Sequence, residues 1–105
     1  MQTLDVIAKE YRHKAFGNSY FSAQVTIDFG LKTEKTYYLP FQYGYEETYL
    51  QETKAFLVKS GILASGSGCL SVICRDNGII LRYGKQTNCK KSEVEAFGKE
   101  PKHNE

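Results

Sequence analysis

The chain has almost no excess of charge of either sign and no long apolar run. Its 14 Lys and Arg residues balance 12 Asp and Glu residues, so the formal net charge is only +2. General binders of nucleic acid or membrane surfaces normally show a basic excess. No stretch approaches the roughly 20 apolar residues of a membrane-spanning helix, and the opening MQTLDVIAKEY lacks a signal-peptide core. We therefore predict a cytoplasmic protein with no membrane contact.

Residue types that hold metals or form disulfides are few and scattered. The three cysteines, Cys69, Cys74 and Cys89, include no CxxC pair, and His13 and His103 lie near opposite ends of the chain. A secreted disulfide framework has an even and denser set of cysteines, so we expect reduced thiols. Because metal sites need ligands at workable spacing, the sequence predicts no metal site and no cofactor.

No arrangement of residues specifies a catalytic chemistry. Cys89 lies beside Lys90 and Lys91, whose charges favour a thiolate, but a solvent-exposed cysteine among ordinary lysines is the simpler interpretation. Gly66-Ser67-Gly68 lacks the Lys-Ser/Thr that completes a phosphate-binding loop. We therefore predict no catalytic residue and a protein that is not an enzyme. A cysteine-dependent enzyme is the remaining alternative.

The composition, 41% hydrophobic and 25% charged, is that of a globular protein, and 105 residues make one domain. We expect this domain to span residues 1–98, with residues 99–105 as a disordered tail. Residues 44–62 predict one amphipathic helix, with Glu46 and Glu47 in its first turn and Lys59 in its last, as the helix dipole favours. Its apolar stripe consists of Tyr45, Tyr49, Leu50, Thr53, Phe56 and Leu57.

Alternating apolar and polar residues predict strands on both sides of this helix. The strands are expected at residues 3–15, 20–29, 36–43, 70–75 and 79–83. Helix is an alternative for the first of them, and Pro40 makes the third an edge strand or a bulged one. Asn77-Gly78 between the last two is a typical hairpin turn, and residues 93–97 predict a short helical turn. The expected fold is α+β: a single antiparallel sheet of four to five strands with one helix on one face, in the order ββ(β)αββ.

Basic and aromatic residues gather before the first predicted turn. Cations hold phosphates while tyrosines stack on bases. One hypothesis is therefore single-stranded nucleic-acid binding through Lys9, Tyr11, Arg12 and Lys14. The alternative is a solvated edge strand whose lysines discourage edge-to-edge pairing, and the near-neutral charge of the chain favours it.

Three short strings occur in a familiar order: GNSY at residues 17–20, LPFQYGY at 39–45 and YLQ at 49–51. This order resembles small uncharacterised proteins of bacteriophages and prophages, over residues 8–62. Glu46-Glu47 departs from the Gly- or Asp-containing version of that pattern. The resemblance carries no catalytic residue. It implies a phage or mobile-element context in a bacterial cytoplasm, where such domains often bind and inhibit host defence, CRISPR nucleases included.

We therefore expect a non-enzymatic protein that acts by occlusion of a host or phage protein, for example in a nucleic-acid-handling complex. The helix acids would mimic phosphates towards a basic groove, although a plain solvated helix face also explains them. The exposed side of the sheet is the other candidate surface, and its tyrosines equally fit a homodimer contact. The partner-binding candidates are Glu46, Glu47, Glu52, Tyr20, Tyr38 and Gln42.

Overall fold

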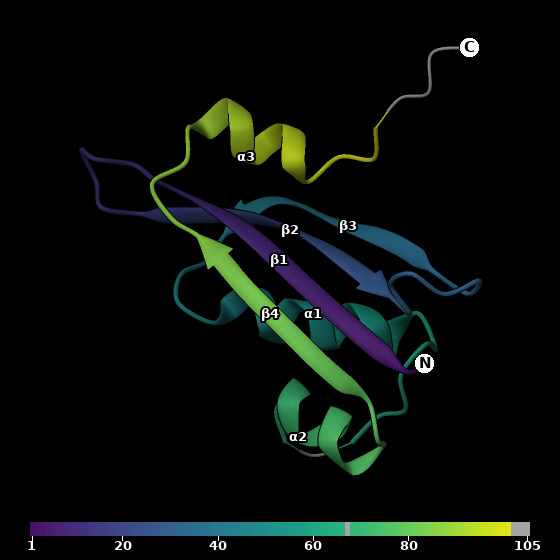
Figure 1. Cartoon of the computed structure of the whole chain (residues 1–105). Coiled ribbons are helices and arrows are strands. Elements are labelled where there is room, and N and C mark those ends of the chain that lie inside the picture. Colours follow the sequence, from purple (N-terminus) through teal and green to yellow (C-terminus); the bar gives the residue numbers. More distant parts are fainter. Residues whose placement is uncertain (67, 102–105) are drawn as a thin grey trace.

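The computed structural model describes residues 1–66 and 68–101, which form an α+β fold around one four-stranded sheet. The elements are β1 (Thr3–Arg12), β2 (Ser19–Ile27), β3 (Lys35–Tyr43), α1 (Thr48–Lys59), α2 (Leu70–Asp76), β4 (Ile80–Gln86) and α3 (Lys91–Phe97). The strand order is β3-β2-β1-β4, and β4 runs parallel to β1 while the other neighbours are antiparallel. Helices α1 and α2 lie on one face of the sheet and α3 on the other (Figure 1).

The predicted sheet and helix count are therefore wrong in part. The sheet is mixed rather than antiparallel, and the described residues form three helices in the order βββααβα. Strand β1 is confirmed as a strand, and β3 is an edge strand, as Pro40 predicted. The short turn predicted at residues 93–97 is a two-turn helix whose N-cap, Lys90, makes no side-chain cap. Residues 102–105 of the predicted tail lie outside the described part.

The core fills the space between the sheet and the two helices α1 and α2. On α1, Tyr49, Thr53 and Leu57 are buried, which is the face expected from a spacing of four residues. The buried Thr53 hydroxyl donates to the Tyr49 carbonyl oxygen at 2.7 Å, so no polar group is left unpaired there. Alternate residues of β1 and β2 complete the core, as the sequence predicts: Leu4, Val6, Ala8, Phe21, Ala23, Val25 and Ile27.

Helix α1 begins later than predicted. Glu46 has a φ of 54°, a left-handed conformation that is incompatible with a helical turn, so the helix begins at Thr48. Consequently Tyr45 lies outside the helix and is 55% exposed, and no acid lies in the first turn. The other end is confirmed, because Lys59 lies in the last turn and Gly61 follows with a φ of 73°.

The segment predicted as a strand at residues 70–75 is helix α2. Its buried residues are spaced at i, i+3 and i+4, which is a helical pattern: Leu70, Ile73 and Cys74. Asn77 is the helix C-cap and Gly78 follows with a φ of 68°, so this pair ends a helix instead of turning a hairpin. A parallel strand such as β4 also requires a long crossover, which α1 and α2 supply.

No helix within residues 1–66 or 68–101 has the length and apolar character needed to traverse a lipid bilayer.

Candidate functional site

A bulge in β3 gathers aromatic side chains on the sheet face opposite the core. The register between β2 and β3 shifts at the stretch of β3 that contains Pro40. One extra residue reverses the alternation of side chains. In a regular strand Phe41 and Tyr43 would lie on the same side as Leu39, but the bulge places them beside Tyr20 on the opposite face.

Five rings form what we call the aromatic end: Tyr11 of β1, Tyr20 of β2, Phe41 and Tyr43 of β3, and Tyr45 after it. The Tyr20 ring is stacked between Tyr11 (centroids 6.4 Å apart, 26° between planes) and Phe41 (5.2 Å, 9°). Tyr43 meets Tyr20 edge to face at 5.8 Å, and Tyr45 meets Tyr43 at 6.4 Å. Such pairs contribute about 0.5–1.5 kcal/mol each. The outer rings, Tyr43 and Tyr45, remain 58% and 55% exposed.

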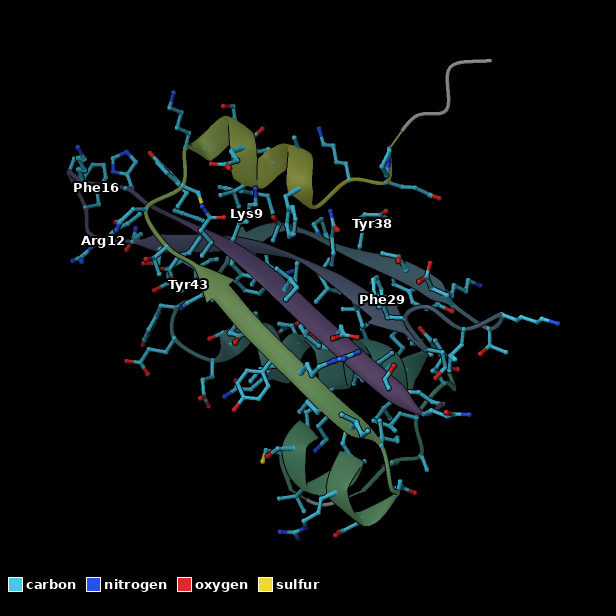
Figure 2. The ribbon with its side chains drawn as sticks, viewed as in Figure 1. Lys9, Arg12, Phe16, Phe29, Tyr38 and Tyr43 are labelled. Atoms are coloured by element: carbon cyan, nitrogen blue, oxygen red, sulfur yellow. The ribbon has the colours of Figure 1, made fainter. Side chains whose placement is uncertain are left out.

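The hairpin between β1 and β2 extends from the same end of the sheet, where Figure 2 shows Phe16 at its tip close to Arg12. The tip is fixed by Gly17, which has a φ of 70° and whose N–H donates to the His13 carbonyl oxygen at 2.7 Å. Phe16 is 78% exposed and stacks on the His13 ring at 5.0 Å.

A hollow of about 740 Å³ lies beside the aromatic end, between this hairpin and the loop after β4. We call it the basic hollow; it is lined by Tyr11, Arg12, Lys14, Asn88, Cys89 and Lys90. None of these residues is acidic. Arg12, Lys14 and Lys90 are exposed, and none of them forms an ion pair with any residue that the structure describes.

Lys9 belonged to the predicted nucleic-acid site but is engaged elsewhere. Its Nζ lies 2.9 Å from a Glu93 carboxylate oxygen on α3 and 4.9 Å from the centre of the Phe97 ring. The hydrogen bond and the charge of Lys9 lower the pKa of Glu93. The structure therefore brings Tyr11 and Arg12 together with Lys14, and it directs the Lys9 ammonium to α3.

The predicted acidic candidates are exposed, and Glu46 and Glu47 adjoin the aromatic end, because both line a hollow with Tyr43 and Tyr45, whereas Glu52 does not. Glu46 lines a shallow hollow together with Tyr43 and Tyr45, and its carbonyl oxygen accepts a hydrogen bond from Lys85 Nζ at 2.8 Å. Glu47 is the N-cap of α1, and Glu52 lies within that helix. The three carboxylates therefore do not form one patch at the aromatic end.

Of the other predicted contact residues, only Tyr20 belongs to the aromatic end. Tyr38 lies nearer the opposite end of β3 and is half-buried (Figure 2). Gln42 pairs with the buried Phe21, so it shares the core side of the sheet, and its amide donates to the Pro40 carbonyl oxygen at 3.0 Å. The sequence did not indicate Phe41, Tyr43 or Tyr45 as contact residues. The only available signal was Pro40, which indicated a bulge without showing its consequence.

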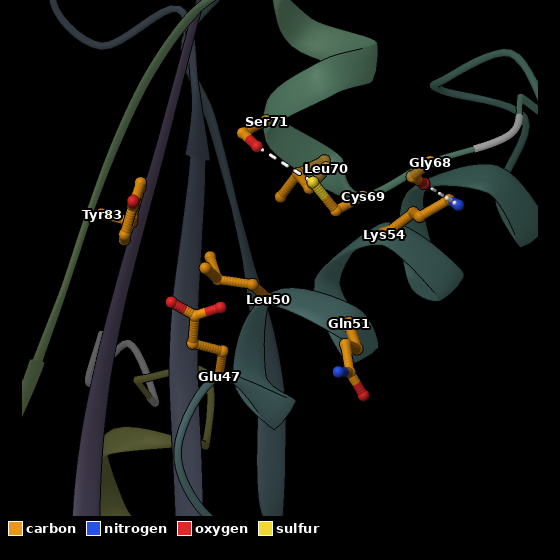
Figure 3. Close-up of a pocket in the computed structure, with 9 residues that line it drawn as sticks. All are labelled: Glu47, Leu50, Gln51, Lys54, Gly68, Cys69, Leu70, Ser71 and Tyr83. Carbon is orange, nitrogen blue, oxygen red and sulfur yellow. Dashed lines mark hydrogen bonds between the residues drawn. The ribbon is translucent and has the colours of Figure 1, made fainter.

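The cysteines are free thiols in three different settings. Cys69 is exposed in a groove of about 420 Å³ between α1 and α2 (Figure 3), where its hydrogen bond with the Ser71 hydroxyl, 3.0 Å long, lowers its pKa. Burial raises the pKa of Cys74. Cys89 is 7% exposed, and its thiol donates to the Gln86 carbonyl oxygen at 3.4 Å, so the predicted solvent-exposed cysteine is buried.

Among residues 1–66 and 68–101, no three His, Cys, Asp or Glu side chains gather in a way that could hold a metal ion. Comparison of the chain with protein-family models, curated proteins and solved structures finds no match. The fold and the site therefore carry the functional argument, and the resemblance to phage proteins stays a prediction.

Proposed function

We propose that this protein is a non-enzymatic protein-binding domain whose contact surface is the aromatic end. The observation that carries the proposal is the gathering of five rings from three neighbouring strands and the following loop, with Tyr43 and Tyr45 more than half exposed. Aromatic side chains are enriched in the centres of protein interfaces, where a few of them supply most of the binding free energy.

The stacking within the aromatic end supports a protein partner over nucleic acid. Base stacking needs a free ring face, but the Tyr20 ring already stacks with the rings of Tyr11 and Phe41. Lys9 pairs with Glu93, which leaves its ammonium unavailable for phosphates. Single-stranded nucleic-acid binding through Tyr11 and its neighbours in the basic hollow remains the second candidate, because three cations lie there without a carboxylate partner.

The rings are held in place before any partner binds. Ordering a flexible side chain in an interface costs about 0.5–1.5 kcal/mol. Tyr20 is already fixed by two neighbours, and Tyr43 by contacts with Tyr20 and Tyr45, so less of this cost falls on association. Such a rigid surface suits a protein that acts by covering a functional site on its partner. The resemblance to phage proteins makes a bacterial nucleic-acid-handling complex, such as a CRISPR nuclease, the first partner to seek.

The test is an affinity pull-down from bacterial lysate, with and without nuclease. Wild type is compared with Tyr43→Ala/Tyr45→Ala, and Phe29→Ala is the matched control. Phe29 is a 65% exposed aromatic residue at the opposite end of the sheet (Figure 2). We expect a stoichiometric protein partner that survives nuclease, is lost with the double variant and is retained by the control. Recovery of nucleic acid alone, lost after nuclease treatment, would overturn the proposal.

A further inference from the structure

We propose that the basic hollow binds an acidic peptide segment of the protein partner, whose carboxylates pair with Arg12, Lys14 and Lys90. The inference rests on the proposed function, because Tyr11 belongs both to the aromatic end and to the wall of the hollow. The inference specifies that the part of the partner that enters the hollow is acidic.

Unneutralised positive charge is concentrated in this hollow. Its three cations come from the end of β1, the hairpin loop and the residue before α3, and the lining contains no acid. The chain as a whole has a net charge of only +2. Four cations outside the hollow are paired with carboxylates: Lys9–Glu93, Arg75–Asp76, Arg82–Asp5 and Lys85–Glu10. Other cations without an ion pair, such as Lys32 and Lys59, do not line the hollow.

Backbone contacts position the wall that carries Lys90. The Cys89 N–H donates to the Glu10 carbonyl oxygen at 3.0 Å, which fastens the loop after β4 to β1. The Glu10 carboxylate lies 2.8 Å from Lys85 Nζ, in an ion pair that is mostly buried. Glu10, the acid of β1 that is closest to Arg12 in the sequence, is thus already paired with Lys85. Lys90 is held beside the hairpin without a carboxylate of its own.

The extent of the charge favours a peptide over a nucleic acid. Binding of single strands uses a positively charged groove that follows the backbone. Here two neighbouring cations are neutralised, Lys9 by Glu93 and Lys85 by Glu10, so of the described residues beyond the hollow only the adjacent Lys91 extends its positive charge. The volume of about 740 Å³ lies within the range that holds one compact ligand group. A guanidinium such as that of Arg12 can bind a carboxylate through two parallel hydrogen bonds, so the site would select the orientation of the carboxylate as well as its charge.

The test is an NMR titration of the whole chain with the acetylated, amidated peptide hexaglutamate at physiological salt. We expect saturable shift changes at the six lining residues of the basic hollow. Arg12→Ala/Lys14→Ala should weaken binding about tenfold or more, since it removes two charge-assisted contacts. The matched variant Lys32→Ala/Lys59→Ala removes the same charge from exposed positions outside the hollow. It should change the affinity less than about twofold because of screening.

Several results would overturn the inference. Shift changes spread over the whole surface, or equal losses in the two double variants, would indicate non-specific attraction. Tighter binding of the oligonucleotide dT12 to the same residues would make the hollow a nucleic-acid site.

A pull-down separates this inference from the function on which it rests. If Arg12→Ala/Lys14→Ala still captures the protein partner fully, the acidic-segment inference fails while the proposed function stands. If wild type binds hexaglutamate in the hollow but captures no protein, the proposed function fails, and with it the assignment of the segment to a partner.

Discussion

Replacing Gly98 with alanine tests how α3 is held on the sheet. Gly98 is buried directly after α3, and a Cβ atom added there would lie 2.7 Å from the Leu39 carbonyl oxygen and 2.7 Å from Ser22 Cβ. Both atoms belong to the packed sheet, so neither can yield easily. Overpacking of this kind costs about 1–3 kcal/mol.

The cost of the clash can be compared with the free energy that docks α3. Buried Val94 and the hydrogen bonds from Ser22 and Gln24 to backbone carbonyls of α3 together contribute about 3–6 kcal/mol. Because the free energy that docks α3 exceeds the cost of the clash, α3 should shift by a few tenths of an ångström and remain on the sheet. The folded state should lose about 1–3 kcal/mol.

Urea denaturation and thermal melting measure this loss. We expect the midpoint temperature of Gly98→Ala to fall by about 4–8 °C per kcal/mol. The matched control is Gly84→Ala in β4, where an added Cβ meets nothing within 4 Å, so the change should stay within about 0.5 kcal/mol. Alkylation of Cys89, buried beside the start of α3, reports whether the helix leaves the sheet.

Unchanged stability of Gly98→Ala would refute the packing argument. Rapid alkylation of Cys89 in the folded variant would show that docking is weaker than the clash, contrary to the comparison above.

Two further predictions concern single titratable groups. The backbone N–H of Gln2 and the hydroxyl of Thr33 lower the pKa of Asp28, so its stabilisation is present above the ordinary carboxyl pKa and is lost as the pH falls through the lowered value. Denaturation of Asp28→Asn should therefore show lower stability at pH 7 and a flatter decline below about pH 4; an unchanged decline would contradict this. Iodoacetamide should modify Cys69 fastest, and Ser71→Ala should slow it, because the Ser71 hydrogen bond lowers the pKa of that thiol. Modification of buried Cys74 and Cys89 at the same rate as Cys69 would contradict this prediction.

Local patterns predicted the parts of the fold whose side chains face one well-defined core. The alternation in β1 and β2 and the spacing of Tyr49, Thr53 and Leu57 were sufficient, because burial on one side imposes a fixed period. The short apolar run at residues 70–75 was not sufficient to predict its secondary structure, since a run of that length fits a strand or a helix. Only tertiary contacts decide: Leu70, Ile73 and Cys74 are buried against the core at helical spacing, and β4 pairs with β1 instead of with residues 70–75.

The candidate site was less predictable because it depends on long-range contacts. The bulge at Pro40 moves Phe41 and Tyr43 to the other face, and the direction of that change follows only from the strand register. Lys9 looks available in the sequence, but its partner Glu93 lies at the far end of the chain. The sequence indicated the basic residues of the hairpin loop and the C-terminal lysines, but only the fold shows that Lys90 lies beside Arg12 and Lys14.

The most direct test of the account is the affinity of the captured partner for three purified proteins, measured by titration calorimetry. If the aromatic end is the contact surface, Tyr43→Ala should bind at least about tenfold more weakly than wild type. Phe29→Ala should bind within about twofold of wild type, because Phe29 lies at the other end of the sheet. Wild-type affinity of Tyr43→Ala, or a loss confined to Phe29→Ala, would contradict the assignment of the surface.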